Sequence, residues 1–138
     1  MRLAAFLLIA VSASAFAASA MTEPQRSPKA EKTLQRELAG KVAGAPVSCV
    51  PPFRTGDMTI VDDNTVLFRA SRNRVYRNDP PGGCSPMSWG GYALVTRSIS
   101  AQLCRGDIVQ IVDVGSGQIA GSCALGDFIP YAVPGSKS

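Results

Sequence analysis

The side chains that could act in catalysis are few, because the chain of 138 residues contains no histidine. A Ser-His-Asp or Cys-His centre needs an imidazole base, so both classes of enzyme are excluded, as are histidine-ligated metal sites. Carboxylates remain, since two acidic side chains suffice for glycoside hydrolysis. The candidates for such chemistry are Asp62, Asp63, Asp107 and Asp127.

These aspartates also have a structural interpretation, which we favour. Asp62 and Asp63 precede Asn64 in a predicted turn, where aspartate is common because its carboxylate bonds to the main chain. Asp107 follows Gly106 at the start of a predicted strand. We therefore predict no catalytic residue, no cofactor and no metal ligand. The expected function is that of a non-enzymatic binding or accessory module of the cell envelope. A small carboxylate-dependent hydrolase acting on an envelope polymer is the alternative.

A cluster of arginines offers a second kind of chemistry, the binding of anions. The cluster consists of Arg69, Arg72, Arg74 and Arg77, interleaved with Phe68 and Tyr76. Guanidinium groups recognise phosphate, an anionic glycan or a lipid headgroup. Because side chains alternate along a strand, Arg72, Arg74 and Tyr76 would share one face and Arg77 the other. The competing interpretation is a solvated strand edge that charge protects against aggregation.

Trp89, the only tryptophan, precedes two glycines and Tyr92. It would either form an exposed aromatic platform for a sugar or peptide or pack over a disulfide, and we favour packing. The predicted binding surface is Arg72, Arg74, Tyr76 and Trp89. Its partner would be an anionic envelope component or another protein. Nucleic acid is not expected, because the basic charge is mild.

Four cysteines, Cys49, Cys84, Cys104 and Cys123, predict two disulfides. The rival is a zinc site, which normally shows paired ligands two to four residues apart, and no such pair occurs. A hairpin joining 107–114 to 118–124 would place Cys123 opposite Val109, too far from Cys104 for a bridge. Of the two remaining pairings we prefer Cys84 with Cys104 and Cys49 with Cys123.

The elements that hold these residues are mainly strands. A short helix begins at Ser27-Pro28 and ends by Gly40 and Gly44, with an expected ion pair between Glu37 and Lys41. The alternating patterns and turn residues predict strands at 46–50, 59–61, 65–70, 74–77, 92–96, 107–114 and 118–124.

This spacing predicts a small disulfide-stabilised antiparallel barrel or sandwich, mainly β, with one short N-terminal helix. The run Gly106-Asp107-Ile108-Val109, with Gly126 and Phe128, is similar to bacterial SH3-like barrels.

The first twenty residues predict export. One basic residue, Arg2, is followed by an apolar run from Leu3 to Val11 and by small residues that suit cleavage after Ala20. The alternative is an uncleaved membrane anchor. Loss of Arg2 lowers the net charge from +4 to +3. We expect a periplasmic or secreted protein without a membrane span after cleavage.

The expected organisation is a signal peptide (1–20), a flexible N-terminus with the short helix (21–44), a single β domain (45–134) and a disordered tail (135–138).

The β domain also resembles a known family. The residues that carry this likeness are Pro46-Val47-Ser48-Cys49, Val61-Asp62-Asp63, Val66-Leu67-Phe68, Tyr76-Arg77-Asn78 with Cys84, Leu103 to Ile108, Gly121 with Cys123, Gly126-Asp127-Phe128 and Pro130-Tyr131. They resemble an uncharacterised family of small exported proteobacterial proteins, a domain of unknown function with four cysteines. The resemblance implies export and a shared cysteine framework, and it implies no activity.

Overall fold

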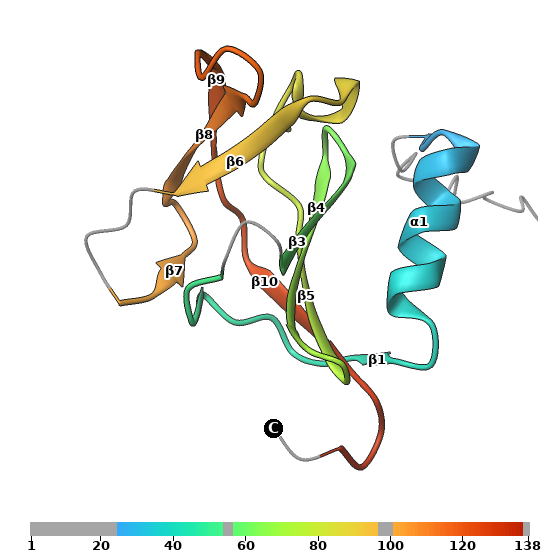
Figure 1. Ribbon diagram of the computed structural model, residues 1–138. Helices are drawn as coiled ribbons and strands as arrows, with labels where there is room; N and C mark the ends of the chain where they lie inside the picture. Colours follow the sequence, from blue (N-terminus) through green and yellow to red (C-terminus); the bar gives the residue numbers. More distant parts are fainter. Residues whose placement is uncertain (1–24, 54–56, 97–100, 137–138) are drawn as a thin grey trace, which may run out of the picture.

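A computed structural model describes residues 25–53, 57–96 and 101–136 of the chain. The predicted signal peptide, residues 1–20, lies outside the described residues. Over the described residues the fold is mainly β, with one α-helix, as the sequence predicts (Figure 1).

The helix α1 (Pro28–Leu38) begins where the sequence places it. The side chain of Ser27 accepts a hydrogen bond from the main-chain nitrogen of Ala30 at 3.2 Å, and Pro28 occupies the first helical position. The expected ion pair between Glu37 and Lys41 is wrong. Lys41 follows the helix, and its ammonium group donates to the main-chain oxygen of Glu37 at 2.9 Å.

In the part of the chain that the structure describes, ten strands form three antiparallel sheets. The five-stranded sheet has the order β1 (Val42–Ala43), β10 (Phe128–Ala132), β5 (Arg74–Asn78), β4 (Thr65–Ser71) and β3 (Met58–Asp62). The three-stranded sheet has the order β6 (Tyr92–Thr96), β8 (Ile108–Asp113) and β9 (Ile119–Ala124), and the ribbon pairs β2 (Cys49–Val50) with β7 (Leu103–Cys104). A 3₁₀ helix, η2 (Met87–Trp89), precedes β6. The sheets stay open and do not close into a barrel.

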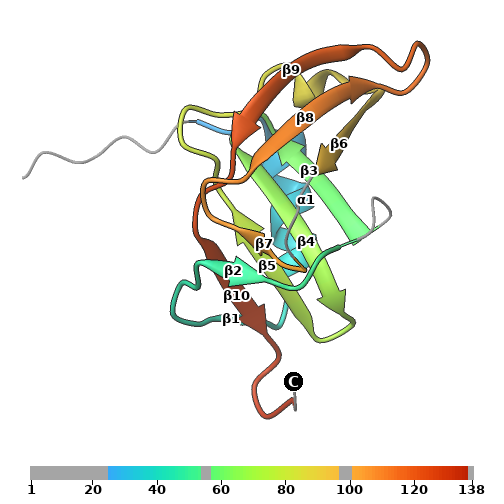
Figure 2. The same cartoon turned by 90° about the vertical axis from the view of Figure 1, so that its left-hand side faces the viewer.

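The molecule has two hydrophobic cores, one on each face of the five-stranded sheet. On one face, Ala30 and Leu34 of α1 pack against Val61, Leu67 and Val75. The other face meets the three-stranded sheet and the ribbon, and its core contains Phe68, Phe128, Met87, Leu94, Val109, Ile111 and Leu125. Figure 2 shows α1 behind the five-stranded sheet, on the face away from β7.

Strand β4 joins the two cores, because successive side chains of a strand point to opposite faces. Val66 and Phe68 belong to the larger core, whereas Leu67 between them packs on α1. All three side chains are buried. An apolar run without polar alternation is what a strand covered on both faces requires.

The two predicted disulfides are confirmed, but the preferred pairing is wrong. Cys49 bonds to Cys104, and Cys84 bonds to Cys123. Cys123 does lie opposite Val109, as predicted, so the rejected pairing of Cys104 with Cys123 stays excluded. The error arose because β7 was not predicted. Its pairing with β2 places Cys104 directly opposite Cys49.

The predicted strands and the hairpin turn at 62–64 are present, with shifts of a few residues at their ends. Strands β1, β7 and β10 were not predicted. In the described ranges, no helix is long and apolar enough to cross a membrane.

Candidate functional site

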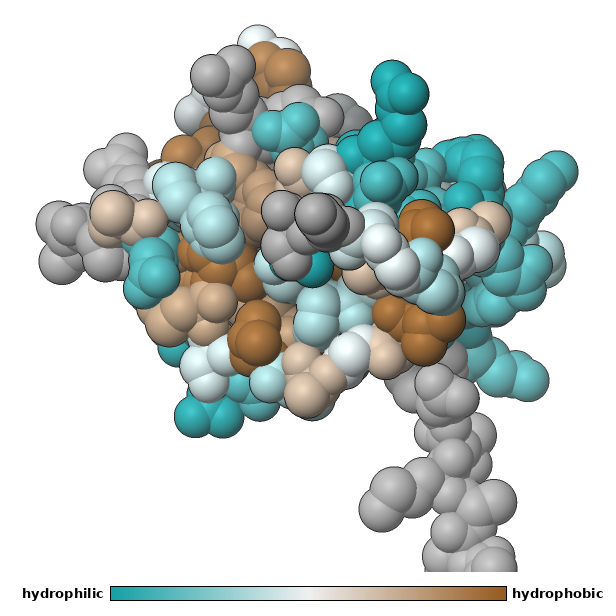
Figure 3. All heavy atoms as spheres, turned by 90° about the horizontal axis from the view of Figure 1, so that it is seen from below, coloured by the Kyte–Doolittle hydropathy of each residue, from teal (hydrophilic) through white to brown (hydrophobic). Residues whose placement is uncertain are grey.

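The end of the β4–β5 hairpin gathers most of the basic side chains that the sequence singled out. Arg69 lies near the end of β4, Arg72 in the turn and Arg74 at the start of β5. Helix α1 and the residues after it add Arg36 and Lys41 beside the same hairpin. We call these five cationic residues the basic hairpin surface. Figure 3 views this end of the molecule, with hydrophilic residues gathered on the side of α1.

A hollow lies on the α1 side of the hairpin, with a volume of about 290 Å³. Its lining residues are Arg36, Glu37, Lys41, Arg69, Arg72 and Val75. Glu37 is the only acidic residue of this set. Its carboxylate forms ion pairs with Arg69 and, at 3.3 Å, with Arg36. Four cationic side chains against one carboxylate leave this hollow strongly positive.

A second hollow, of about 340 Å³, lies beside the same hairpin and has an aromatic wall. Its lining includes Phe53, Asp57, Arg69, Arg74 and Tyr76. The rings of Phe53 and Tyr76 are 6.0 Å apart, and both pack against the larger core. Arg69 lines both hollows, which lie on the two faces of the hairpin, one with Val75 on the α1 side and the other with Phe53 and Tyr76.

The structure places two of the predicted binding residues, Arg74 and Tyr76, in one hollow and a third, Arg72, in the other. Arg74 and Tyr76 line the aromatic hollow together, as alternation along β5 predicts. Arg72 lines the other hollow. The prediction that Arg72 shares their face is wrong, because Arg72 lies in the turn, where strand alternation does not apply.

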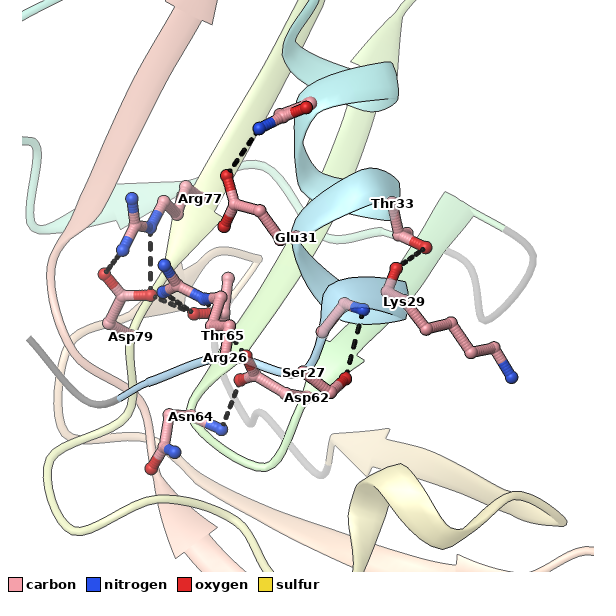
Figure 4. A network of polar contacts seen from close by, with 12 residues as sticks. Arg26, Ser27, Lys29, Glu31, Thr33, Asp62, Asn64, Thr65, Arg77 and Asp79 are labelled. Atoms are coloured by element: carbon pink, nitrogen blue, oxygen red, sulfur yellow. Dashed lines mark hydrogen bonds and ion pairs between the residues drawn. The ribbon is translucent and has the colours of Figure 1, made fainter.

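Arg77, the fourth arginine of the sequence cluster, belongs to a different contact network (Figure 4). Its guanidinium donates to both carboxylate oxygens of Asp79, at 3.0 and 2.8 Å. Burial disfavours the charged form, but the hydrogen bond and charge of Asp79, together with Tyr131, raise the pKa of Arg77 above its ordinary value. Arg77 is therefore a structural cation.

The same network ties the chain before α1 to the five-stranded sheet. Arg26 donates to the Asp62 carboxylate at 3.0 Å and to the Thr65 hydroxyl at 2.8 Å. The Thr65 hydroxyl donates in turn to Asp79 at 2.7 Å. Figure 4 shows these side chains converging beside the first turn of α1. Thr65 is fully buried, so this chain of contacts satisfies a hydroxyl that water cannot reach.

Trp89, the last predicted binding residue, lies on η2 with 76% of its surface exposed. It does not bury itself over a disulfide, which corrects the interpretation that we favoured. Its neighbours Ser88 and Gly90 line a cleft of about 490 Å³ between α1, β3 and η2. This cleft shares no lining residue with the hollows at the hairpin. Trp89 is thus separate from the basic hairpin surface.

The four candidate aspartates each hold a structural contact. Asp62 accepts a hydrogen bond from the main-chain nitrogen of Asn64 at 2.8 Å, in addition to its pair with Arg26. Asp63 accepts from the nitrogen of Ser88 at 2.7 Å and so joins the β3–β4 turn to η2.

Asp107 and Asp127 have similar roles elsewhere in the fold. Asp107 accepts from the nitrogen of Cys104 at 2.7 Å, and Asp127 pairs with Arg105 at 3.3 Å. These contacts favour the turn-forming interpretation over a carboxylate active site. Among residues 25–53, 57–96 and 101–136, no group of three or more cysteine, aspartate and glutamate side chains is placed to hold a metal ion.

Sequence reasoning missed the residues that α1 and the segment after it contribute. Arg36, Glu37 and Lys41 are 28 or more residues from Arg69 in the chain, and only the packing of α1 on the sheet brings them together. The available signal was the position of Leu34 and Leu38 on one helix face, which fixes the face that turns toward the sheet. Phe53 was also missed, because no pattern marks it as a neighbour of Tyr76.

Comparison with known proteins finds no matching family model, no matching curated protein and no matching solved structure. The resemblance to an exported family stays a prediction.

Proposed function

We propose that the protein is an exported, non-enzymatic binding module that takes an anionic component of the cell envelope on its basic hairpin surface. The observation that carries this proposal is the concentration of charge. Five cationic side chains border the two hollows at the hairpin, against two carboxylates, Glu37 and Asp57. The whole chain has a net charge of only +4. One end of the molecule therefore carries most of its positive excess.

The scaffold supports a binding role. The hairpin that presents Arg69, Arg72 and Arg74 is anchored by the first half of β4, whose Val66, Leu67 and Phe68 side chains are buried in the two cores. A rigid support lowers the conformational entropy lost when a ligand is bound. The predicted signal peptide agrees with two disulfides, which form and persist in oxidising compartments.

A retention experiment tests the proposal. The double variant Arg72→Ala/Arg74→Ala removes two charges from the basic hairpin surface. The matched control Lys29→Ala/Arg105→Ala removes two exposed charges elsewhere, at the other end of α1 and before β8. On an immobilised heparin column we expect the hairpin variant to elute at clearly lower salt than the control. Equal elution of the two would show that retention depends on net charge alone, and the proposal would fail.

A further inference from the structure

We infer that the hollow between α1 and the β4–β5 turn is a site for a phosphoryl group, and that the carboxylate of Glu37 occupies it in the free protein. This inference rests on the proposed function. It assigns binding to one hollow and to one class of ligand. It also states that the carboxylate of Glu37 competes with this ligand for the cationic side chains.

Glu37 is held as a bound anion would be. One carboxylate oxygen faces the Nε of Arg36 at 3.3 Å, and the other accepts from a terminal nitrogen of Arg69. The main-chain oxygen of the same residue accepts from the ammonium of Lys41. Three cations from two separate segments thus converge on one acidic residue. The position of its carboxylate marks where an incoming anion finds donors.

The carboxylate leaves much of the positive charge unused. Within the described part of the chain, the guanidinium of Arg72 makes no hydrogen bond and no ion pair, although it lines the same hollow. The hollow has a volume of about 290 Å³ and is open enough for a group larger than a carboxylate. A ligand with more oxygens and more charge would engage Arg72 as well.

A phosphoryl group has the matching chemistry. A phosphomonoester carries a charge of roughly −1.5 to −2 at neutral pH and three strong acceptor oxygens. Guanidinium groups bind such oxygens through charge-assisted hydrogen bonds, often in pairs. A single carboxylate has two oxygens and one charge. The excess of three cations over the Glu37 carboxylate therefore favours a phosphoryl ligand over a second carboxylate.

Displacement of Glu37 is feasible because its partners face water. The side chains of Arg36 and Arg69 are 67% and 52% exposed, whereas that of Glu37 is 14% exposed. Because the guanidinium end of each pair faces solvent, water and salt screen the pairs and an anion can reach the arginines from outside. A phosphoryl group can consequently replace the carboxylate while the arginines keep their positions on α1 and β4.

The test measures binding of inorganic pyrophosphate by calorimetry at low salt. Glu37→Gln removes the competing charge and keeps the shape of the side chain. We expect it to bind pyrophosphate about two- to fivefold more tightly than the wild type, the range of one ion pair whose arginine is screened by solvent. Arg72→Ala, which leaves the contacts of Glu37 intact, should bind severalfold more weakly.

Glu31→Gln is the matched control. It removes the same charge from the same helix, but Glu31 bonds to Gln35 and does not line the hollow. Its affinity should equal that of the wild type or exceed it by less than that of Glu37→Gln. If Glu37→Gln binds more weakly than the wild type, or no more tightly than Glu31→Gln, the carboxylate organises the arginines and does not compete, and the inference is overturned.

A second arm separates the sources of the phosphoryl group. Vesicles of phosphatidylglycerol are compared with vesicles of phosphatidylcholine. Binding of pyrophosphate together with phosphatidylglycerol vesicles supports a lipid headgroup, and binding of pyrophosphate alone supports a soluble phosphate. If pyrophosphate does not bind while the hairpin variant still loses retention on heparin, the inference fails and the proposed function stands.

Discussion

Asn78 and Gly126 form a reciprocal pair of hydrogen bonds across the interior of the fold. The side-chain nitrogen of Asn78 donates to the main-chain oxygen of Gly126 at 2.8 Å, and its side-chain oxygen accepts from the nitrogen of Gly126 at 2.9 Å. Asn78 is fully buried at the end of β5. The pair fixes the segment between β9 and β10, 48 residues away in the chain.

Replacement of Asn78 by alanine should destabilise the protein by about 2 kcal/mol or more, because it leaves both main-chain groups of Gly126 without their partner in a buried place. Urea unfolding followed by circular dichroism measures the effect. Asn73→Ala is the control, since Asn73 lies exposed in the β4–β5 turn. Equal midpoints for the two variants would contradict this account.

The two disulfides should differ in their rate of reduction in the folded protein. Cys49 is exposed and Cys104 half-buried, whereas Cys84 and Cys123 are both buried in the larger core. A mild reductant, followed by timed alkylation and peptide mass mapping, should label Cys49 and Cys104 first. In denaturant, where burial no longer protects either bridge, we expect the difference to disappear. Earlier labelling of Cys84 would show that exposure does not control the order.

Loss of either bridge should cost about 4 kcal/mol in the chain-entropy estimate, because the sequence separations of 55 and 39 residues are similar. The rate of reduction and the loss of stability are thus separate properties.

The turn between β8 and β9 should contribute a pH-dependent increment of stability. The main-chain nitrogen and the hydroxyl of Ser116 donate to the carboxylate of Asp113, at 2.7 and 3.1 Å, and lower its pKa below the ordinary 3.8. Because the pKa of Asp113 is lower in the folded state, the carboxylate stabilises the fold at any pH above its ordinary pKa. This stability is lost as the pH falls through the lowered pKa of the folded state.

Asp113→Asn should therefore lower the thermal midpoint at neutral pH, and the difference from the wild type should shrink as the pH falls below 3.8. Differential scanning fluorimetry across this range measures it. If the difference between the two thermal midpoints does not change with pH, the effect comes from the shape of the side chain and not from the charge of the Asp113 carboxylate.

Strand β10 shows why part of the fold could not be predicted from the sequence. Pro130 lies in its middle, and a proline normally argues against a strand paired on both sides. Here the oxygen of Pro130 accepts from Gly44, on the β1 side. The nitrogen of Pro130 faces the same side. The absence of an N–H group on proline therefore removes no hydrogen bond between β10 and β5. The two-residue length of β1 makes this arrangement possible.

The hairpins were predictable because their signals are local. Turn residues at 62–64 and 115–117 join runs that pair within a few positions. The candidate site was only half predictable, because Arg69, Arg72 and Arg74 are near each other in the chain, whereas Glu37 reaches them through the docking of α1. The correct disulfide pairing likewise depends on β2 meeting β7 from 55 residues away.

Both sulfur bridges lie on one side of the five-stranded sheet. The ribbon and the three-stranded sheet contain three of the cysteines, and the fourth precedes η2, whereas the contact between α1 and the sheet contains none. Among the described residues, apolar packing, ion pairs and the hydrogen bond from Arg26 to Thr65 hold the helix in place. In a reducing compartment, loss of the disulfides would thus weaken the larger core and leave the contacts of α1 with the sheet unchanged. Concentrated salt would instead screen the ion pairs of α1 and leave the disulfides unchanged.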